Sequence, residues 1–309
     1  MMEGEMFIIR VPGSTANLGP GFDSIGLALN QYLTLEVEKA SHWKVEMLSE
    51  ELKVFPSDKT NYIIQVALET AKKYGCNLPP CLIKMKSEIP LTRGLGSSAA
   101  AIIAGIELAD FLGHLNLSRE EKLSQAASME GHPDNVGASL YGGLIIGKQD
   151  GEKVDVVSFQ PITFDVVAVI PHEELETKDS RNVLPKQLPF SEAVKAGAIS
   201  NVLVAALLTG DYKLAGKMMK EDLYHQPYRT LLVPHLQEVE ELSLKEGAFG
   251  VALSGAGPTV VCFAEKGKGQ SLKNKLQLLM PQMDVRNLAI DQAGSKVMIS
   301  ERCQKYHSN

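Results

Sequence analysis

Cysteine is scarce in this sequence, and its scarcity excludes two kinds of protein. The 309 residues contain four cysteines, at Cys76, Cys81, Cys262 and Cys303. None of them forms a C-x-x-C pair, and no histidine lies at metal-ligand spacing from one. Disulfide-stabilised secreted domains and cysteine-based zinc sites need more thiols, more closely spaced. We therefore expect reduced thiols, with neither a disulfide framework nor a zinc site.

Long apolar runs and an excess of positive charge are also lacking. The N-terminal segment carries Glu3 and Glu5 and has no apolar run of signal-peptide length. We expect no stretch to approach the roughly 20 apolar residues of a membrane span. Lysine and arginine number 31 against 37 aspartates and glutamates, for a net charge of −6. Such a protein has no general attraction for nucleic acid or anionic membranes. We expect a cytoplasmic protein whose anion sites are local.

The first half of the chain has the patterns of a mixed α and β domain. Apolar alternation predicts strands at Phe7–Val11, Tyr32–Glu38 and Trp43–Leu48, with antiparallel pairing as the simplest arrangement. Helical spacing predicts a helix over Thr60–Tyr74. A length of 309 residues suits one large or two medium domains. The polar segment around Gln149–Val154 is the best boundary, which gives domains at 1–152 and 153–309.

The second half has patterns of the same mixed kind. Buried-type strands are predicted at Phe164–Ile170, Ala248–Leu253, Thr259–Phe263 and Val285–Ile290. Helices are predicted at Ser191–Leu208, Tyr212–Met219, Val233–Lys245 and Lys268–Leu279. The fold class of the whole chain is therefore α+β.

The stretch from Pro90 to Ala100 is typical of a phosphate-binding loop. Gly94 and Gly96 permit positive φ and leave no Cβ between the backbone N–H groups and a bound anion. Ser97 and Ser98 suit an N-cap, and the Ala-rich run that follows predicts a helix ending near Gly113. The N-terminus of that helix favours a phosphate, and the Ser98 hydroxyl could contact a phosphate-bound Mg²⁺. Taken alone, the pattern is equally compatible with a tight strand-to-helix connection.

A second polar segment follows a helix that Ser118 and Glu121 open with a capping box. It comprises residues 130–137, which read Glu-Gly-His-Pro-Asp-Asn-Val-Gly and which we interpret as a loop. Glu130 lies at the helix C-terminus, where a negative charge is disfavoured, so a cation is expected nearby. This segment is a candidate for the chemistry of the protein.

Four segments together resemble the GHMP small-molecule kinases, the family of galactokinase, homoserine kinase, mevalonate kinase and phosphomevalonate kinase. They are Val11–Asp23, the glycine loop Pro90–Ala100, Glu130–Asn135 and the second glycine motif Leu253–Val260. The resemblance covers both halves of the chain. It implies a ribosomal S5 domain 2-like N-terminal domain and a ferredoxin-like C-terminal domain, with ATP and Mg²⁺ as cofactors. It also implies a homodimer.

The resemblance further implies which residues hold the nucleotide and the metal. Mg²⁺ would be held by Ser98 and Glu130. Asn61 is similar to a family contact to adenine, although it could equally cap the helix that begins there. Arg93 replaces the small residue of many family members and either adds a phosphate contact or lies in solvent. The nucleotide residues are Asn61, Pro90, Leu91, Thr92, Arg93, Gly94, Leu95, Gly96, Ser97, Ser98, Ala99 and Ala100.

Within that family the sequence is most similar to the homoserine kinases, which implies L-homoserine as the small-molecule substrate. Its ammonium group requires a carboxylate, and its carboxylate a guanidinium. The candidates are Asp23, with Asp134, for the ammonium, and Arg181 and Arg229 for the carboxylate. Asn17 and Asn135 would hold the hydroxyl end.

Asn135 bears on the mechanism because an amide cannot accept a proton. Mevalonate-kinase-like members have an aspartate at the corresponding place. Phosphoryl transfer through a loose transition state develops little charge on the attacking oxygen, so a strong base is not essential. Our hypothesis is base-free transfer in which Asn135 orients the hydroxyl and Ser98 and Glu130 act through the metal.

Other interpretations remain open at this point. Asp23 could stabilise a turn, Arg181 and Arg229 could be surface residues, and His132 is more typical of a structural residue than of a base. The acceptor could be another small alcohol such as mevalonate. The chain could also be a non-catalytic ligand sensor on the same fold, although such a protein would have no need of Glu130 and Ser98.

Overall fold

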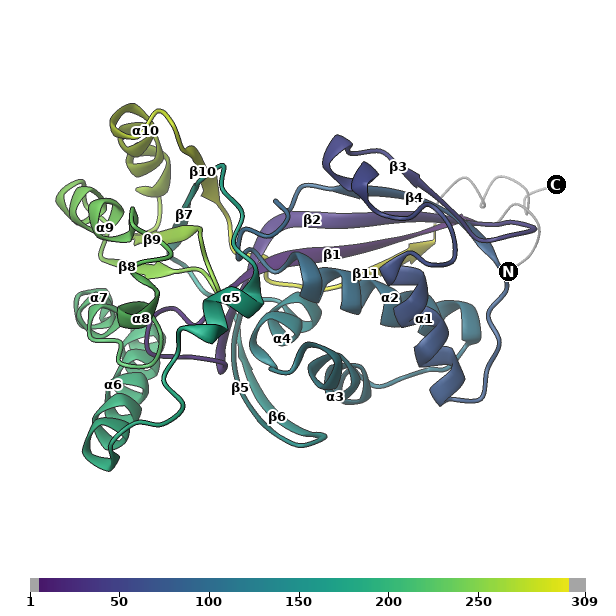
Figure 1. The fold of residues 1–309 in the computed structure, drawn as a ribbon, viewed down its shortest axis with the longest axis horizontal. Helices are drawn as coiled ribbons and strands as arrows, with labels where there is room; N and C mark the ends of the chain where they lie inside the picture. Colours follow the sequence, from purple (N-terminus) through teal and green to yellow (C-terminus); the bar gives the residue numbers. More distant parts are fainter. Residues whose placement is uncertain (1–5, 300–309) are drawn as a thin grey trace.

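The computed structural model describes residues 6–299, which form two β-sheets with helices packed against them (Figure 1). The larger sheet and helices α1 to α4 make up one half of the molecule. The smaller sheet and helices α6 to α10 make up the other, with α5 between the two halves in this view. Cys303 and the C-terminal residues after Ile299 lie outside the described part of the chain.

The larger sheet has seven strands. Its continuous path is β11-β1-β2-β4-β3, and β5 pairs with the first part of β2 and with β6. Alternating apolar residues of β2 are buried, which confirms the predicted pattern. The strands are β1 (Met6–Ala16), β2 (Ile25–Lys39), β3 (Lys44–Met47), β4 (Cys81–Ser87), β5 (Leu144–Asp150), β6 (Lys153–Phe159) and β11 (Lys296–Ile299).

The predicted antiparallel pairing of the second and third strands is wrong. β4 lies between them, antiparallel to β2 and parallel to β3, with Val45 opposite Ile83. Parallel neighbours need a long crossover connection, which is usually helical. A short 3₁₀ helix (Glu50–Val54) and α1 (Tyr62–Lys73) supply it, so the predicted helix after Thr60 is what allows the parallel pair.

Three further helices complete the first half. α2 (Ser97–Gly113) is buried on almost all sides, and α3 (Arg119–Glu130) begins with the predicted Ser118–Glu121 capping box. The predicted N-cap role of Ser97 and Ser98 is wrong, because Gly96 caps α2 in a left-handed conformation with φ 73°. The segment interpreted as a loop up to Gly137 is also partly helical, since α4 (Asp134–Tyr141) begins inside it.

The smaller sheet has four antiparallel strands in the order β10-β7-β9-β8. Along the chain the pattern is strand, helices, two strands, helix, strand, which is the ferredoxin-like arrangement that the resemblance implied. The strands are β7 (Asp165–Ile170), β8 (Gly250–Leu253), β9 (Val260–Ala264) and β10 (Asp284–Leu288). The predicted helices are found as α6 (Phe190–Thr209), α7 (Tyr212–Lys220), α9 (Leu236–Lys245) and α10 (Gly269–Leu279). Two short helices, α5 (Thr177–Asn182) and α8 (Gln226–Arg229), escaped sequence analysis.

The expected boundary at residue 152 falls in the turn of the β5–β6 hairpin. Both strands of that hairpin belong to the larger sheet, and the smaller sheet begins only at Asp165. The chain then returns at its other end, where β11 pairs with β1 and places Phe7 opposite Ile299. The chain therefore passes from the larger sheet to the smaller one between Phe159 and Asp165. Residues 153–309 also contribute β6 and β11 to the larger sheet, so they do not form the second half alone.

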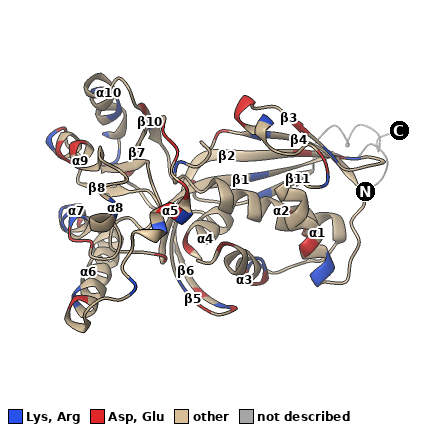
Figure 2. Cartoon of the chain, viewed as in Figure 1, with Lys and Arg blue, Asp and Glu red and all other residues tan. Residues whose placement is uncertain are grey.

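Helix α6 contradicts the prediction that no stretch approaches the apolar length of a membrane span. Its 20 residues are long and apolar enough to cross a membrane by length and composition, and 28% of its apolar 18-residue window lies buried. A single helix of this kind is weak support for a membrane span, because core helices of soluble proteins pass the same test. α6 packs against α7 within the second half. Figure 2 shows charges of both signs distributed over the outer helices, with neither sign predominating in that view.

Candidate active site

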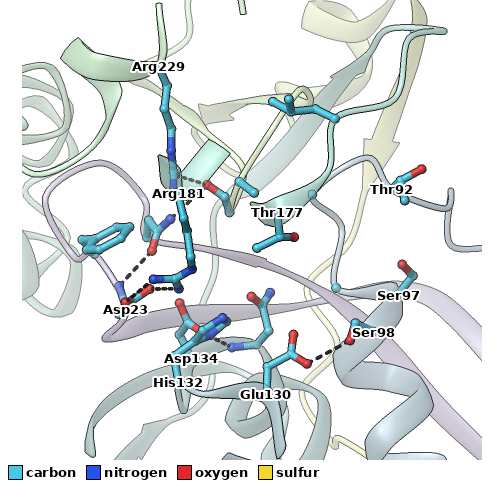
Figure 3. A pocket seen from close by; sticks show the side chains of 18 residues that line it. Asp23, Thr92, Ser97, Ser98, Glu130, His132, Asp134, Thr177, Arg181 and Arg229 are labelled. Atoms are coloured by element: carbon cyan, nitrogen blue, oxygen red, sulfur yellow. Dashed lines mark hydrogen bonds and ion pairs between the residues drawn. The ribbon is translucent and has the colours of Figure 1, made fainter. Parts of the chain in front are cut away.

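A polar cavity of about 140 Å³ lies between the two halves of the molecule. The first half contributes the loop after β1, the glycine loop and the α3–α4 junction, and the second half contributes α5, Arg229 and the second glycine motif (Figure 3). The cavity lining includes Asn17, Asp23, Thr92, Gly94, Gly96, Ser97, Ser98, Glu130, Asp134, Asn135, Arg181 and Arg229. Most of the candidate residues from the sequence therefore meet in one place.

The glycine loop has the conformation that its two glycines permit. Gly94 and Gly96 each have φ 73°, and their neighbours leave no room for a side chain. A Cβ on Gly94 would lie 2.3 Å from the carbonyl oxygen of Ser254, and one on Gly96 would lie 2.2 Å from Ser14 Oγ. The Ser254 hydroxyl also donates to the Gly94 carbonyl at 2.6 Å. The first and last motifs thus pack directly on the loop and fix its backbone.

Ser98 and Glu130 meet beside the N-terminus of α2. Ser98 Oγ donates to Glu130 Oε2 at 2.9 Å, as the dashed line in Figure 3 shows. Burial raises the pKa of Glu130, and the charge of His132 and the hydrogen bond from Ser98 oppose this only in part. The pair offers adjacent oxygen donors in a site that disfavours an uncompensated carboxylate. Those are properties of a site for a hard cation.

Asp23 and Arg181, predicted to bind opposite ends of a substrate, bind each other here. Arg181 Nη1 and Nη2 donate to the two carboxylate oxygens of Asp23 at 3.0 and 2.7 Å. Burial lowers the pKa of Arg181, but the hydrogen bonds and charge of Asp23 outweigh it, so the pKa is raised overall. The pair joins the loop after β1 to α5 and lines the cavity on both sides. Arg181 is therefore not a free surface arginine.

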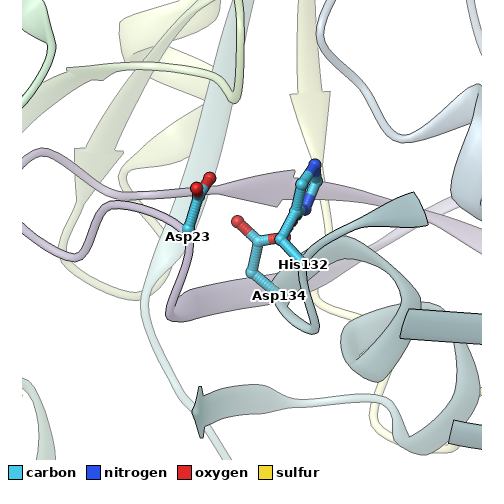
Figure 4. Close-up of side chains that lie close together, drawn as sticks. All are labelled: Asp23, His132 and Asp134. Carbon is cyan, nitrogen blue, oxygen red and sulfur yellow. Dashed lines mark hydrogen bonds and ion pairs between the residues drawn. The ribbon is translucent and has the colours of Figure 1, made fainter. Parts of the chain in front are cut away.

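His132 and Asp134 form a hydrogen-bonded pair next to Asp23 (Figure 4). His132 Nδ1 lies 2.5 Å from Asp134 Oδ1, and one ligand atom of each of the three residues lies within 4.8 Å of the others. Burial lowers the pKa of His132, but the hydrogen bond and charge of Asp134 raise it further, with a net increase. His132 lines the cavity, and its bond to Asp134 is compatible with the structural role predicted for it.

Arg229 is almost completely buried in the cavity wall, at 1% exposure. Its Nε donates to the carbonyl of Ser180 at 3.0 Å, and its Nη1 to the carbonyl of Gly255 at 2.9 Å. Burial lowers the pKa of Arg229 to about 10, and the charge of Arg181 acts in the same direction. The surface interpretation of Arg229 is therefore wrong. A buried guanidinium with neutral partners is suited to receive an anion.

The two candidate asparagines are held differently. Asn17 Nδ2 donates to the Gly255 carbonyl at 3.0 Å and its Oδ1 accepts from the Asp23 N–H at 3.0 Å, so both amide atoms have backbone partners. Asn135 Nδ2 donates to Ser14 Oγ at 2.9 Å. Within the described residues, Asn135 Oδ1 has no hydrogen-bond partner. The structure thus gives Asn17 a loop-holding role and leaves an acceptor on Asn135.

A second cavity, of about 280 Å³ and mostly apolar, adjoins the first. The two share Thr92, Ser97 and Ser98, so the glycine loop separates them. Asn61 lies in its wall and caps α1, where its Oδ1 accepts from the Ile63 N–H at 3.1 Å and its Nδ2 donates to Pro56 at 2.9 Å. The helix-capping interpretation is confirmed, and the adenine contact stays a prediction.

Arg93 turns away from both cavities and toward the second half of the molecule. Its guanidinium donates to the carbonyls of Leu91, Pro171 and His172 and pairs with Glu174 at 3.2 Å. Neither a phosphate contact nor free solvent exposure describes this side chain. Arg93 instead ties the glycine loop to the segment that follows β7.

Several cavity residues were not found from the sequence. Thr177 belongs to α5, a six-residue helix without a long apolar period. The Thr177–Arg181 stretch is polar throughout, and that polarity was the available signal. Leu175 lies outside the recognised motifs, whereas Phe22, Gly255 and Ala256 lie within them but were given no role of their own.

Comparisons with known proteins agree with this site. The descriptions of the N-terminal and C-terminal GHMP kinase domains match residues 61–143 and 203–282. The homoserine kinase of Bacillus licheniformis is 52% identical over 95% of this chain and 96% of its own length. That of Halalkalibacterium halodurans is 49% identical over 94% of both. The crystal structure of homoserine kinase from Cytophaga hutchinsonii superposes with a TM-score of 0.82 at 29% identity, covering 96% and 98% of the chains. The chain therefore belongs to the GHMP kinase family and, within it, to the homoserine kinases.

Proposed function

We propose that this enzyme transfers the γ-phosphoryl group of ATP to the side-chain hydroxyl of L-homoserine, giving O-phospho-L-homoserine and ADP in threonine biosynthesis. One observation carries the proposal: a glycine loop at a helix N-terminus lies between an apolar cavity and a cavity lined by charged groups of both signs. The first arrangement suits a nucleotide, and the second suits an amino acid.

ATP would lie across the glycine loop. The apolar cavity offers Leu52, Phe55 and Tyr62 as surroundings for the adenine ring. The phosphates would then lie on the backbone of Gly94 and Gly96, at the N-terminus of α2, where N–H groups are free and the helix dipole favours negative charge. In this placement the γ-phosphate faces the polar cavity, because the two cavities meet at the loop.

L-Homoserine would lie in the polar cavity, with each charged group facing an opposite one. Asp23 and Asp134 offer carboxylates to the ammonium, and Arg229 offers its free edge to the carboxylate. Both Nη1 and Nη2 of Arg181 donate to Asp23. Arg181 would therefore contact the substrate either while still paired with Asp23 or after that ion pair has broken. The charges of the substrate would thereby compensate the partly buried charges of the protein.

Mg²⁺ fits the oxygen pair of Ser98 and Glu130, and these two residues would hold it. When bound, the ion would neutralise charge on the transferred phosphoryl group. The raised pKa of Glu130 is consistent with this role, since a nearby cation would restore the ionised carboxylate. The neighbouring Asp23, His132 and Asp134 are engaged with one another and with Arg181, and we assign them to the substrate.

Asn135 would orient the attacking hydroxyl without removing its proton. Ser14 holds the amide through Nδ2, so Oδ1 is the acceptor available to a substrate O–H. The proton would pass late to a phosphate oxygen. We expect Asn135→Ala to lower the maximal rate by about tenfold to a hundredfold, since orientation is lost but no base is. An unchanged rate in this variant would contradict the orienting role.

The activity is tested by measuring ADP release with MgATP and a panel of acceptors: L-homoserine, L-threonine, L-serine, mevalonate and galactose. We expect strong turnover with L-homoserine alone. Turnover only with mevalonate or another alcohol would keep the nucleotide site and discard the assignment of the charged cavity. ATP binding without turnover of any acceptor would favour the sensor interpretation.

We further propose a cytoplasmic homodimer that binds neither nucleic acid nor membrane. The solvent-facing side of α6 supports a dimer, because it exposes apolar side chains in a row. Phe190 is 86% exposed, Val194 57%, Val202 38% and Leu208 40%. Such a row usually marks an interaction surface. The mass in solution, measured by sedimentation, tests the dimer, and a monomer at micromolar concentration would contradict it.

A further inference from the structure

His225 is fully buried beneath the polar cavity and touches none of its open space. It is the N-cap residue of α8, one turn before Arg229. Its Nε2 lies 2.9 Å from the carbonyl oxygen of Gly19, in the loop after β1, and its Nδ1 lies 3.1 Å from Arg229 Nη1. The ring therefore bridges the substrate loop of the first half to the buried arginine of the second.

The chemistry of the groups around the ring fixes its protonation, and Asp222 Oδ2, at 3.3 Å from Nε2, is a further acceptor there. A guanidinium can only donate, so Nδ1 must accept from Arg229, and a carbonyl can only accept, so the proton is on Nε2. Burial lowers the pKa of His225 to about 4, and the charge of Arg229 lowers it too, against the opposing charge of Asp222. The ring is thus neutral near pH 7, in one defined tautomer.

The surroundings hold the ring as firmly as its hydrogen bonds do. Phe22 stacks on it with ring centroids 5.3 Å apart, and the guanidinium carbon of Arg229 lies 5.5 Å from the centre of the same Phe22 ring. Asp222 accepts the backbone N–H groups of residues 224, 225 and 226 at 2.7, 3.2 and 2.8 Å. The start of α8 is thereby fixed, and the imidazole with it.

Arg229 has three acceptors, and together they define which edge of its guanidinium is free. The carbonyl of Ser180 takes Nε, and the carbonyl of Gly255 shares Nη1 with His225. Within the described residues, Nη2 has no partner. His225 is the one side chain among the three acceptors, so it is the one that a substitution can remove.

We propose that His225 is a positioning residue for the acceptor substrate: by accepting from Arg229 Nη1, it keeps the Nη2 edge toward the cavity and so sets the affinity for the substrate carboxylate. The inference rests on the proposed function, because it needs an amino-acid acceptor. The inference goes beyond the residues proposed to contact the substrate, because His225 does not line the cavity.

Two amide substitutions separate this role from simple support of the fold. In His225→Asn the amide oxygen takes the place of Nδ1, which keeps the acceptor for Arg229 and loses the donor to Gly19. In His225→Gln the amide nitrogen reaches the place of Nε2, which keeps the donor and loses the acceptor. Both variants leave a polar side chain of reduced volume in the same space, so each is the control of the other.

The experiment measures KM for L-homoserine and for ATP in both variants. We expect His225→Gln to raise the KM for L-homoserine about tenfold, in line with a lost hydrogen bond to a charged group, and His225→Asn to raise it less than threefold. KM for ATP should change in neither. Because KM does not depend on the folded fraction of a preparation, a destabilised variant still gives a result. Equal effects of the two substitutions, or a matching rise in KM for ATP, would overturn the inference.

A double-mutant cycle with Arg229→Met completes the test. If His225 acts through Arg229, His225→Gln should add less than twofold to the KM of the Arg229→Met enzyme. A full tenfold addition in that background would overturn the inference while leaving the proposed function intact. Absence of L-homoserine phosphorylation by the unmodified enzyme would overturn the proposed function, and the inference with it.

Discussion

The two ends of the cleft are built in different ways. The phosphate end consists of backbone, within the eleven residues from Pro90 to Ala100, and its geometry follows from two glycines and a helix start. The amino-acid end consists of side chains from distant segments, and the hydrogen bonds between Asp23 and Arg181 span 158 positions of sequence. A site made of backbone excludes side chains at its glycine positions but depends on only one short segment. A site made of side chains depends on every helix and loop that orients them.

Removing the buried guanidinium should break the amino-acid end alone. We expect Arg229→Met to raise the KM for L-homoserine about a hundredfold, because a buried charged hydrogen bond to a carboxylate is worth roughly 2–5 kcal/mol when one partner is truncated. KM for ATP should stay within twofold. Initial-rate kinetics with each substrate varied in turn will decide. A parallel loss of ATP affinity would mean that the two ends are not independent.

A methyl group in the glycine loop should break the phosphate end. Gly96→Ala forces a Cβ against Ser14 in a left-handed conformation, so we expect a loss of about 3 kcal/mol in the free energy of unfolding, together with weaker ATP binding.

The matched control is Gly210→Ala. Gly210 has a similar φ of 77° but open space around it, so only the backbone term of about 1 kcal/mol should appear, with no change in KM for ATP. Urea denaturation and ATP titration of both variants test the pair. Equal losses would show that backbone strain, not the packing of Ser14 on the loop, determines the effect.

Lowering the pH should destabilise the protein through His225, at the amino-acid end of the cleft, and this effect should be smaller than those of the substitutions above. The folded pKa of His225, about 4, lies below the ordinary value of 6.5, so the unfolded chain binds the extra proton first. Stability from this residue is fully present above pH 6.5 and is lost progressively as the pH falls toward 4. We expect the unmodified enzyme to lose more stability between pH 7 and pH 4.5 than His225→Asn does. Denaturation midpoints at several pH values measure this, and parallel curves would contradict it.

The sequence predicted the local structure of the glycine loop well because its determinants are local. The turn, the glycines and the helix after them lie within one short stretch, and all were found. The N-cap was misplaced because Ser97 and Ser98 are good cap formers, yet Gly96 alone can take the left-handed conformation that turns the chain into α2. Local propensity favoured the two serines as the N-cap, whereas Gly96, which packs against Ser14, is the N-cap in the structure.

The sequence named residues that meet in the charged cavity, but not their arrangement. Nothing in the residues around Arg229 indicates burial, which arises when α8 folds against α5 and the second glycine motif. The pairing of Asp23 with Arg181, the turn of Arg93 toward the second half and the place of β4 between β2 and β3 are likewise tertiary. Periodicity assigns faces to elements, but it does not say which element comes to lie beside which.

The pairing of β11 with β1 bears on how the protein assembles during its synthesis. β1 leaves the ribosome well before β11, and that strand, which covers the outer edge of β1, is separated from it by the entire second sheet. Until that strand emerges, the edge of β1 presents unpaired backbone groups, which are a template for association with other chains. The nascent first half should therefore need protection from aggregation until β11 has been made.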